Sequence, residues 1–142
     1  MAKIPYTANA HVTGGRDGQR RTSDGEPDVN LCRPKEMGGE GGGTNPEELF
    51  AVGYAACFAS ALAGVARRGH LDVGEASIDS AMSLLPTGDG CFKLAVTLDV
   101  PLPSFDRDVA AELVRRAHQV CPYSNATRGN IPVELLLGGQ LI

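Results

Sequence analysis

The longest run of apolar positions in this 142-residue chain, residues 49–66, contains no charged residue. Helix-start signals come just before it: Asn45 can serve as the N-cap, and Pro46 suits the first helical position. Two arginines and then Gly69 follow it, as is common at the end of a helix. These signals predict one helix from about Pro46 to about Arg68. Because the helix is apolar on nearly all faces, we expect protein to enclose it.

This stretch is also long enough to raise the question of a membrane span. It is rich in alanine, however, it includes Gly53, Cys57 and Gly64, and charged residues lie at both of its ends. No other segment of the sequence could cross a bilayer. We therefore predict a buried helix at the centre of a soluble protein that has no membrane partner.

Alternating apolar and polar residues elsewhere in the chain are typical of strands. Such alternation predicts strands within residues 3–13, 27–33, 75–86, 91–101 and 131–137. A second helix, with one apolar face, is expected from about Phe105 to Val120, and Cys121-Pro122 then ends it. This order of elements predicts an α+β fold with largely antiparallel sheets around a long central buried helix.

The composition fits one compact domain, residues 1–142. The formal net charge of −4 argues against a nucleic-acid partner, because binding to phosphates relies on clustered Lys and Arg. Residues 2–6 include one Lys and then Pro instead of a long apolar stretch, so we expect no export signal and a cytoplasmic location. The four cysteines are then expected in a reducing compartment.

The cysteines are the residues best suited to chemistry. Cys57 lies in the middle of the apolar helix, where a thiol is either an inert packing group or a nucleophile. Burial raises the pKa of a thiol, so a reactive Cys57 requires a nearby cation, and Arg16 in a glycine-flanked turn is the obvious candidate. Cys121, where the second helix breaks, is either a packing residue or a second redox thiol. Cys32 and Cys91 are expected to be bystanders.

Metal and cofactor motifs do not occur in the sequence. There is no Cys-x-x-Cys or His-x-x-x-His pair, and His11, His70 and His118 are scattered. The glycine-rich segment 38–43 lacks the Lys-Ser/Thr ending of a phosphate loop, and no dinucleotide fingerprint is present. We therefore predict no metal and no cofactor.

Two long motifs resemble those of a known family. Residues 44–58 read Thr-Asn-Pro-Glu-Glu-Leu-Phe-Ala-Val-Gly-Tyr-Ala-Ala-Cys-Phe, and residues 120–130 read Val-Cys-Pro-Tyr-Ser-Asn-Ala-Thr-Arg-Gly-Asn. In this order they resemble the segments around the two cysteines of the organic hydroperoxide resistance proteins, a branch of the osmotically inducible protein C superfamily. The resemblance extends over essentially the whole chain, from residue 14 to the last predicted strand.

The resemblance implies an OsmC-like fold, an intertwined homodimer and an antioxidant peroxidase of the stress response. In this family Cys57 would be the peroxidatic thiol and Cys121 the resolving thiol, with Arg16 as the activating arginine and Glu47 as the carboxylate that positions it. The implied reductant is a dithiol, a dihydrolipoyl group on a protein. Cys32 and Cys91 lie outside the family pattern.

The expected mechanism starts with attack of the Cys57 thiolate on an organic hydroperoxide, which leaves an alcohol and a sulfenic acid. Cys121 then closes a disulfide, and the dithiol reopens it by exchange. An apolar wall would favour alkyl and lipid hydroperoxides over hydrogen peroxide. The residues predicted for this wall are Leu49, Phe50, Phe58 and Met37.

The helix adds a geometric constraint. Glu47 and Cys57 are ten residues apart, roughly 15 Å along a continuous helix, and an arginine side chain covers less than half of that distance. If Arg16 contacts both, either the helix is broken or the carboxylate comes from the other subunit of a dimer. We expect the second arrangement.

The sequence is also compatible with two other functions. One is a general osmotic-stress thiol peroxidase of the sister branch, with looser substrate choice. The other is a non-enzymatic protein that binds hydrophobic small molecules and uses its cysteines only for packing.

Overall fold

The computed structural model describes residues 2–142, apart from the side chains of residues 19–21. The chain divides into two compact units, the first ending at Leu49 and the second running from Phe50 to Ile142. Helix α1 (Pro46–Arg68) passes from one to the other. The assignment of the whole chain to one domain stays a prediction, and each unit is described by itself below.

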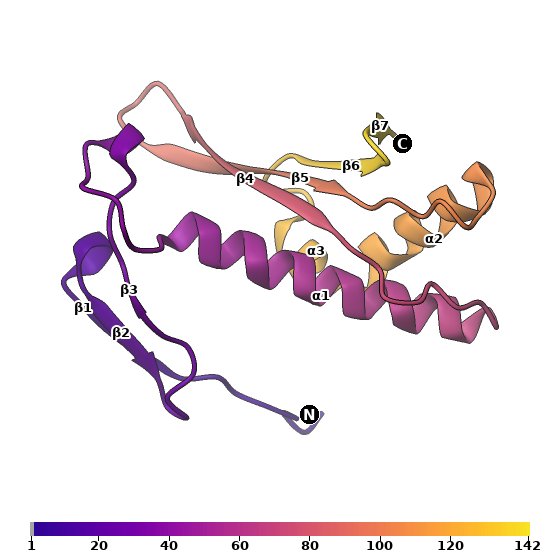
Figure 1. Cartoon of the computed structure of the whole chain (residues 1–142), viewed down its shortest axis with the longest axis horizontal. Coiled ribbons are helices and arrows are strands. Elements are labelled where there is room, and N and C mark those ends of the chain that lie inside the picture. Colours follow the sequence, from indigo (N-terminus) through magenta and orange to yellow (C-terminus); the bar gives the residue numbers. More distant parts are fainter. Residues whose placement is uncertain (1) are drawn as a thin grey trace. The chain divides into compact units, whose positions relative to one another are not determined.

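The first unit is a small antiparallel sheet in the order β1-β2-β3 (Figure 1). Its strands are β1 (Ala10–Thr13), β2 (Gln19–Thr22) and β3 (Asp28–Asn30), and two short 3-10 helices, η1 (Gly15–Asp17) and η2 (Lys35–Met37), follow β1 and β3. The strand predicted within residues 3–13 is thus much shorter, and β2 was not predicted at all. Its four residues, Gln-Arg-Arg-Thr, carry no apolar alternation that a sequence pattern could detect.

The second unit has a four-stranded sheet in the order β4-β5-β6-β7. Its elements after α1 are β4 (Asp79–Pro86), β5 (Phe92–Asp99), α2 (Arg107–Val120), α3 (Pro122–Thr127), β6 (Val133–Leu137) and β7 (Gln140–Leu141). Strands β4 and β5 pair antiparallel as a hairpin, and β6 lies parallel to β5 because helices α2 and α3 connect them. The predicted α+β class with largely antiparallel pairing is confirmed.

The core of the second unit lies between this sheet and the two longer helices. Tyr54, Phe58 and Leu62, spaced by four on α1, are fully buried against Leu98 of β5 and Val114 of α2. In Figure 1, α1 runs alongside the β4–β5 hairpin. The alternation that predicted β5 thus directs one side of that strand into the core.

Only one side of α1 is enclosed within the chain. Its buried residues are Tyr54, Phe58, Leu62, Val65 and Ala66, whereas Val52 on the opposite side is 69% exposed. The prediction that protein encloses the helix on all faces is therefore not met by a single chain. By length and composition α1 is apolar enough to cross a membrane, a test that the core helix of a soluble protein also passes.

Candidate active site

The turn between β1 and β2 presents Arg16. Gly14 and Gly15 have φ values of 76° and 58°, a left-handed conformation that favours glycine. Gly18 has no room for a side chain, since an added Cβ would lie 1.7 Å from the carbonyl oxygen of Thr13. The glycines therefore allow a tight turn in which Arg16 lies on the one-turn helix η1.

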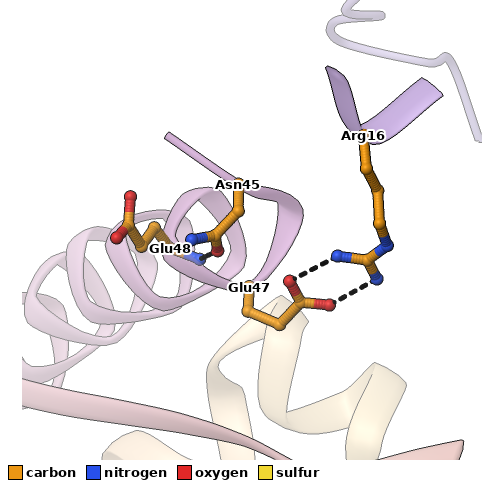
Figure 2. A network of polar contacts seen from close by, with 4 residues as sticks. All are labelled: Arg16, Asn45, Glu47 and Glu48. Atoms are coloured by element: carbon orange, nitrogen blue, oxygen red, sulfur yellow. Dashed lines mark hydrogen bonds and ion pairs between the residues drawn. The ribbon is translucent and has the colours of Figure 1, made fainter. Parts of the chain in front are cut away.

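Arg16 forms a bidentate ion pair with Glu47 of the same chain (Figure 2). Nη1 donates to Oε2 at 2.8 Å and Nη2 donates to Oε1 at 2.7 Å. This hydrogen bonding lowers the pKa of the Glu47 carboxyl and raises the pKa of Arg16. The Arg16 side chain is 37% exposed and the Glu47 side chain 14%, so the guanidinium keeps an open side.

The start of α1 holds Glu47 in place. As predicted, Asn45 is the N-cap: its Oδ1 accepts a hydrogen bond of 2.9 Å from the backbone N–H of Glu48 (Figure 2). The hydroxyl of Thr44 donates to the Glu48 carboxylate at 2.7 Å. These bonds fix the backbone of the first helical turn. Glu47 lies on this turn, so the cap helps to orient its carboxylate toward Arg16.

An apolar cavity of about 470 Å³ opens beside Arg16 within the first unit. Its walls come from the three strands and from the start of α1, and they include Val12, Val29, Leu31, Pro46 and Leu49. Among the lining residues whose side chains the structure describes, Arg16 is the one that is ionisable. The cavity thus combines an apolar interior with a cation at its edge.

In the second unit, the sulfur atoms of Cys57 and Cys121 lie 3.6 Å apart. Both cysteines are free; Cys57 is partly buried and Cys121 fully buried. Cys121 lies at the junction between α2 and α3 in an extended conformation, with Pro122 as the first residue of α3. The end of the helix that the sequence predicted before this proline therefore brings the second thiol against the middle of α1.

Burial raises the pKa of the Cys57 thiol above its ordinary value. The backbone N–H of Tyr123 donates a hydrogen bond that acts in the opposite direction, and the neighbouring Cys121 raises the pKa further. The net effect keeps the thiol protonated at neutral pH. Ionisation of Cys57 therefore requires a positive charge in addition to these groups.

A buried polar network connects the two cysteine-bearing segments. The Tyr54 hydroxyl lies 2.9 Å from Oγ of Ser124 and 3.1 Å from Oγ1 of Thr127. Ser124 also lies 2.8 Å from Nδ1 of His118, whose pKa is lowered mainly by burial. Tyr54 precedes Cys57 by about one helical turn, and Ser124 follows Cys121 by three residues. The network therefore fastens α3 to α1 beside the sulfur pair.

Sequence reasoning missed this network and the helix α3 itself. Tyr54, His118, Ser124 and Thr127 were not predicted as site residues. A signal was nevertheless present, because Ser124 and Thr127 are three residues apart, a spacing that puts both hydroxyls on one side of a helical turn. Their partner Tyr54 is 70 residues from Ser124, and no local pattern shows such a contact.

Comparisons with known proteins show which proteins this chain resembles. The OsmC-like protein family matches residues 39–136. An organic hydroperoxide resistance protein of Xanthomonas axonopodis pv. citri is 51% identical, with 95% of this chain and 96% of the relative covered. The chain belongs to the organic hydroperoxide resistance family of OsmC-like proteins.

Solved structures of this family have the same fold. The crystal structure of an organic hydroperoxide resistance protein from Legionella pneumophila is 46% identical, superposes with a TM-score of 0.92, and covers 96% of this chain and 99% of its own. The organic hydroperoxide resistance protein OhrB of Bacillus subtilis is 44% identical with a TM-score of 0.86, covering 94% and 99%. The predicted OsmC-like fold is confirmed.

In this member of the organic hydroperoxide resistance family, the predicted site residues fall into separate groups. Arg16 pairs with Glu47, and Cys57 pairs with Cys121. Helix α1 is unbroken, which excludes the first of the two arrangements considered for Arg16. The glycine turn brings Arg16 to the Glu47 of its own chain, and the arrangement in which Glu47 and Cys57 on one arginine come from different subunits stays a prediction.

The residues predicted for an apolar substrate wall do not all line one cavity. Leu49 lines the cavity beside Arg16, but Met37, 41% exposed on η2, does not. Phe50 instead makes an edge contact with Tyr123. Phe58 was wrongly assigned to this wall, since it is fully buried in the core of the second unit.

The remaining candidates for chemistry stand apart from these groups. Cys32 and Cys91 are free thiols, and Cys91 is exposed. Within the residues that the structure describes, no three His, Cys, Asp or Glu side chains converge in a way that could hold a metal ion.

Proposed function

We propose that this protein is a cysteine-based peroxidase that reduces organic hydroperoxides to alcohols and so contributes to antioxidant defence. The observation that carries the proposal is the 3.6 Å separation of two reduced thiols, one of them partly accessible. Relatives up to 51% identical over nearly the whole chain are organic hydroperoxide resistance proteins, which supports the same substrate class. The cytoplasm, as a reducing compartment, is where such a cycle would operate.

The chemistry would proceed in three balanced steps. The Cys57 thiolate attacks the distal oxygen of ROOH, the O–O bond breaks, and the departing alkoxide takes up a proton to become the alcohol. Cys57 is then a sulfenic acid. The Cys121 sulfur attacks this sulfur, an S–S bond forms, and the hydroxyl leaves as water with the thiol proton. A dithiol reductant, in our proposal a dihydrolipoyl group on a protein, exchanges with the disulfide and is itself oxidised.

Activation of Cys57 would require a homodimer. The ion pair with Glu47 holds the Arg16 guanidinium in position with an open side, whereas burial disfavours the Cys57 thiolate. Glu47 and Cys57 lie roughly 15 Å apart along one unbroken helix, so an arginine bound to this Glu47 is out of reach of this Cys57. In our proposal the Arg16–Glu47 pair of one subunit therefore faces Cys57 of the other.

The surface of α1 supports such an association. Val52 is 69% exposed and Leu49 37% exposed on a helix that is apolar on nearly all faces. Burial of apolar surface of this kind is the main driving force for stable association between subunits. A partner chain seated here would complete the enclosure of α1 that the sequence predicts.

Mass spectrometry after one equivalent of cumene hydroperoxide tests the proposal. We expect a loss of two hydrogen atoms and a peptide linkage between Cys57 and Cys121, together with one equivalent of cumyl alcohol. Cys57→Ser should abolish alcohol formation, whereas Cys91→Ser, which changes an exposed thiol, should leave it intact. A protein that binds the hydroperoxide but yields no alcohol would be a binding protein and not a peroxidase.

A further inference from the structure

The turn that carries Arg16 is held by a second ion pair within the first unit. Asp17, the next residue on η1, binds Arg33, which lies between β3 and η2. Its Oδ2 accepts a hydrogen bond of 2.8 Å from Nε of Arg33 and lies 2.7 Å from Nη2. Its Oδ1 accepts a further hydrogen bond of 3.1 Å from the backbone N–H of Arg33. The Asp17 carboxylate thus contacts both the side chain and the backbone of Arg33.

The glycine-rich loop packs around the backbone of Arg33. The carbonyl oxygen of Arg33 accepts a hydrogen bond of 3.3 Å from the N–H of Gly41. A Cβ added to Gly39 would lie 1.9 Å from the same oxygen, so this close approach requires glycine. The backbone N–H of Cys32, just before Arg33, donates to the carbonyl of Thr44 at 2.9 Å. These contacts attach Arg33 to the loop that leads into α1.

The turn itself supplies few restraints on Arg16. Gly14 and Gly15 precede it, and glycine has more backbone freedom than any other residue. Helix η1 is a single turn, and none of the side chains that the structure describes caps it. The backbone bond from the N–H of Asp17 to the carbonyl of Gly14 is 3.2 Å long. The orientation of Arg16 therefore depends on ion pairs with residues outside the turn.

We propose that Asp17 and Arg33 are positioning residues, because their ion pair holds Arg16 in the orientation that activates the reactive thiol. The inference rests on the proposed peroxidase function and adds two residues to its site. Two consecutive side chains of η1 bind different partners: Arg16 binds Glu47 at the start of α1, and Asp17 binds the segment after β3. Attachment at two points restrains the turn against rotation about either one. Asp17 and Arg33 act through Arg16 and do not contact the reacting atoms.

The charges around the turn give Asp17 a second effect on Arg16. Hydrogen bonding to Asp17 raises the pKa of Arg33, and the charge of Arg16 acts in the opposite direction. The two guanidinium groups are thus close enough to repel each other, and the carboxylate of Asp17 offsets this repulsion. Without the carboxylate, we expect the repulsion to displace the turn and to weaken the bond from Arg16 to Glu47.

Asp17→Asn tests this role because a general charge effect predicts the opposite result. The substitution keeps an oxygen that can accept from the Arg33 backbone, and it removes one negative charge. If Asp17 acted only through its charge at a distance, its removal would favour the thiolate and move the pH profile of Cys57 alkylation to lower pH. Loss of positioning moves the same profile to higher pH. The direction of the shift therefore separates the two explanations.

The first experiment measures iodoacetamide alkylation of Cys57 against pH in the Cys121→Ser background, and kcat/KM for cumene hydroperoxide with both cysteines present. For Asp17→Asn and Arg33→Gln we expect a profile displaced to higher pH and kcat/KM lowered about two- to fivefold, as for loss of an exposed ion pair. Lys35→Gln removes the same charge as Arg33→Gln from an exposed side chain two residues away, and it should match the wild type. An Asp17→Asn profile at the wild-type pH or below it, or an equal loss in Lys35→Gln, would overturn the inference.

A titration of Glu47 in the Cys57→Ser protein separates this inference from the proposed function. This protein cannot react with hydroperoxide at residue 57, so carbon NMR of the carboxyl group reports on the ion pair alone. Hydrogen bonding from Arg16 lowers the pKa of Glu47, so Asp17→Asn should raise that pKa toward its ordinary value. Removal of a nearby negative charge would by itself lower it, and a Glu47 pKa that is unchanged or lower in Asp17→Asn would refute the positioning role. Wild-type protein that reduces no cumene hydroperoxide would refute the peroxidase, and the titration would still decide the role of Asp17.

Discussion

The sulfur atoms of Cys57 and Cys121 lie 3.6 Å apart in the reduced protein, although the two residues are 64 positions apart in the chain. A disulfide requires a sulfur–sulfur distance of about 2.05 Å, so the two atoms need to approach by roughly 1.5 Å. The bonds from Tyr54 to Ser124 and Thr127 hold the two segments together. The fold thus positions the thiols for disulfide formation with little rearrangement.

Loss of the second thiol should leave the first oxidation product unprotected. In Cys121→Ser, a sulfenic acid at Cys57 has no partner, so we expect it to persist and to form an adduct with dimedone after one equivalent of hydroperoxide. Excess hydroperoxide should then convert Cys57 to the sulfinic and sulfonic acids, as measured by mass spectrometry. Cys91→Ser should behave like the wild type. Equal resistance of Cys121→Ser and the wild type to overoxidation would contradict the assigned role of Cys121.

The ionisation of Cys57 should depend on Arg16. Burial raises the pKa of this thiol, and only its thiolate reacts with iodoacetamide. In a Cys121→Ser background, Arg16→Gln should move the pH profile of Cys57 alkylation to higher pH and slow the reaction at pH 7 about tenfold for each pH unit of displacement. Arg115→Gln, a change on the exposed side of α2, is the control and should have no effect. The same profile with and without Arg16 would exclude this arginine as the activating cation.

The Arg16–Glu47 pair should make a small contribution to stability that depends on pH. Hydrogen bonding from Arg16 holds the pKa of Glu47 below its ordinary value of 4.5. The folded-state pKa is the lower one, so the stabilisation is fully present above about pH 4.5 and is lost as the pH falls through the folded-state pKa. Because Arg16 is more than one-third exposed, Glu47→Gln should lower the free energy of unfolding at pH 7 by only about 0.5 kcal/mol.

Urea unfolding of the wild type and Glu47→Gln at pH 7, 5 and 3 measures this contribution. The difference in the free energy of unfolding should be the same at pH 7 and 5 and smaller at pH 3. Glu48→Gln is the matched control, since Glu48 accepts a hydrogen bond from Thr44 and has no arginine partner among the side chains that the structure describes. If the difference in the free energy of unfolding grew as the pH was lowered, the pKa of Glu47 would not be lowered by folding, contrary to this prediction.

Tyr54→Phe should weaken the connection between α1 and α3. The change removes the hydrogen bonds between the phenolic oxygen and the buried hydroxyls of Ser124 and Thr127, and the loss of a hydrogen bond costs about 0.5–1.5 kcal/mol. We expect a loss of stability of this size and slower closure of the Cys57–Cys121 disulfide after stoichiometric oxidation, measured by quenched-flow mass spectrometry.

Tyr123→Phe is the control for that experiment. Tyr123 is 38% exposed and contacts the rings of Phe50 and Tyr54, and its hydroxyl is not part of the network described above. It should close the disulfide at the wild-type rate. If Tyr54→Phe and Tyr123→Phe slow closure equally, ring packing and not the hydroxyl network positions Cys121.

Much of the fold could be predicted from local patterns. The N-cap at Asn45 and the apolar run after it specified α1, and strict alternation specified the β4–β5 hairpin, because both signals are encoded within a few residues of one another. The strand β2 and the short helix α3 were missed. Each has few residues and little apolar periodicity, so pairing and packing with distant segments determine them.

By itself, the sequence determined the family, the α+β class and the identity of the reactive residue types, since motifs and periodicity are local properties of the chain. Only the tertiary structure decided which side chains meet: Arg16 with the Glu47 of its own chain, Cys57 with Cys121, and Tyr54 with Ser124. It also showed that Phe58 lies in the buried core and that the Arg68 side chain lies over Gly64. These contacts depend on the packing of segments that are far apart in sequence, and no spacing within a segment reveals them.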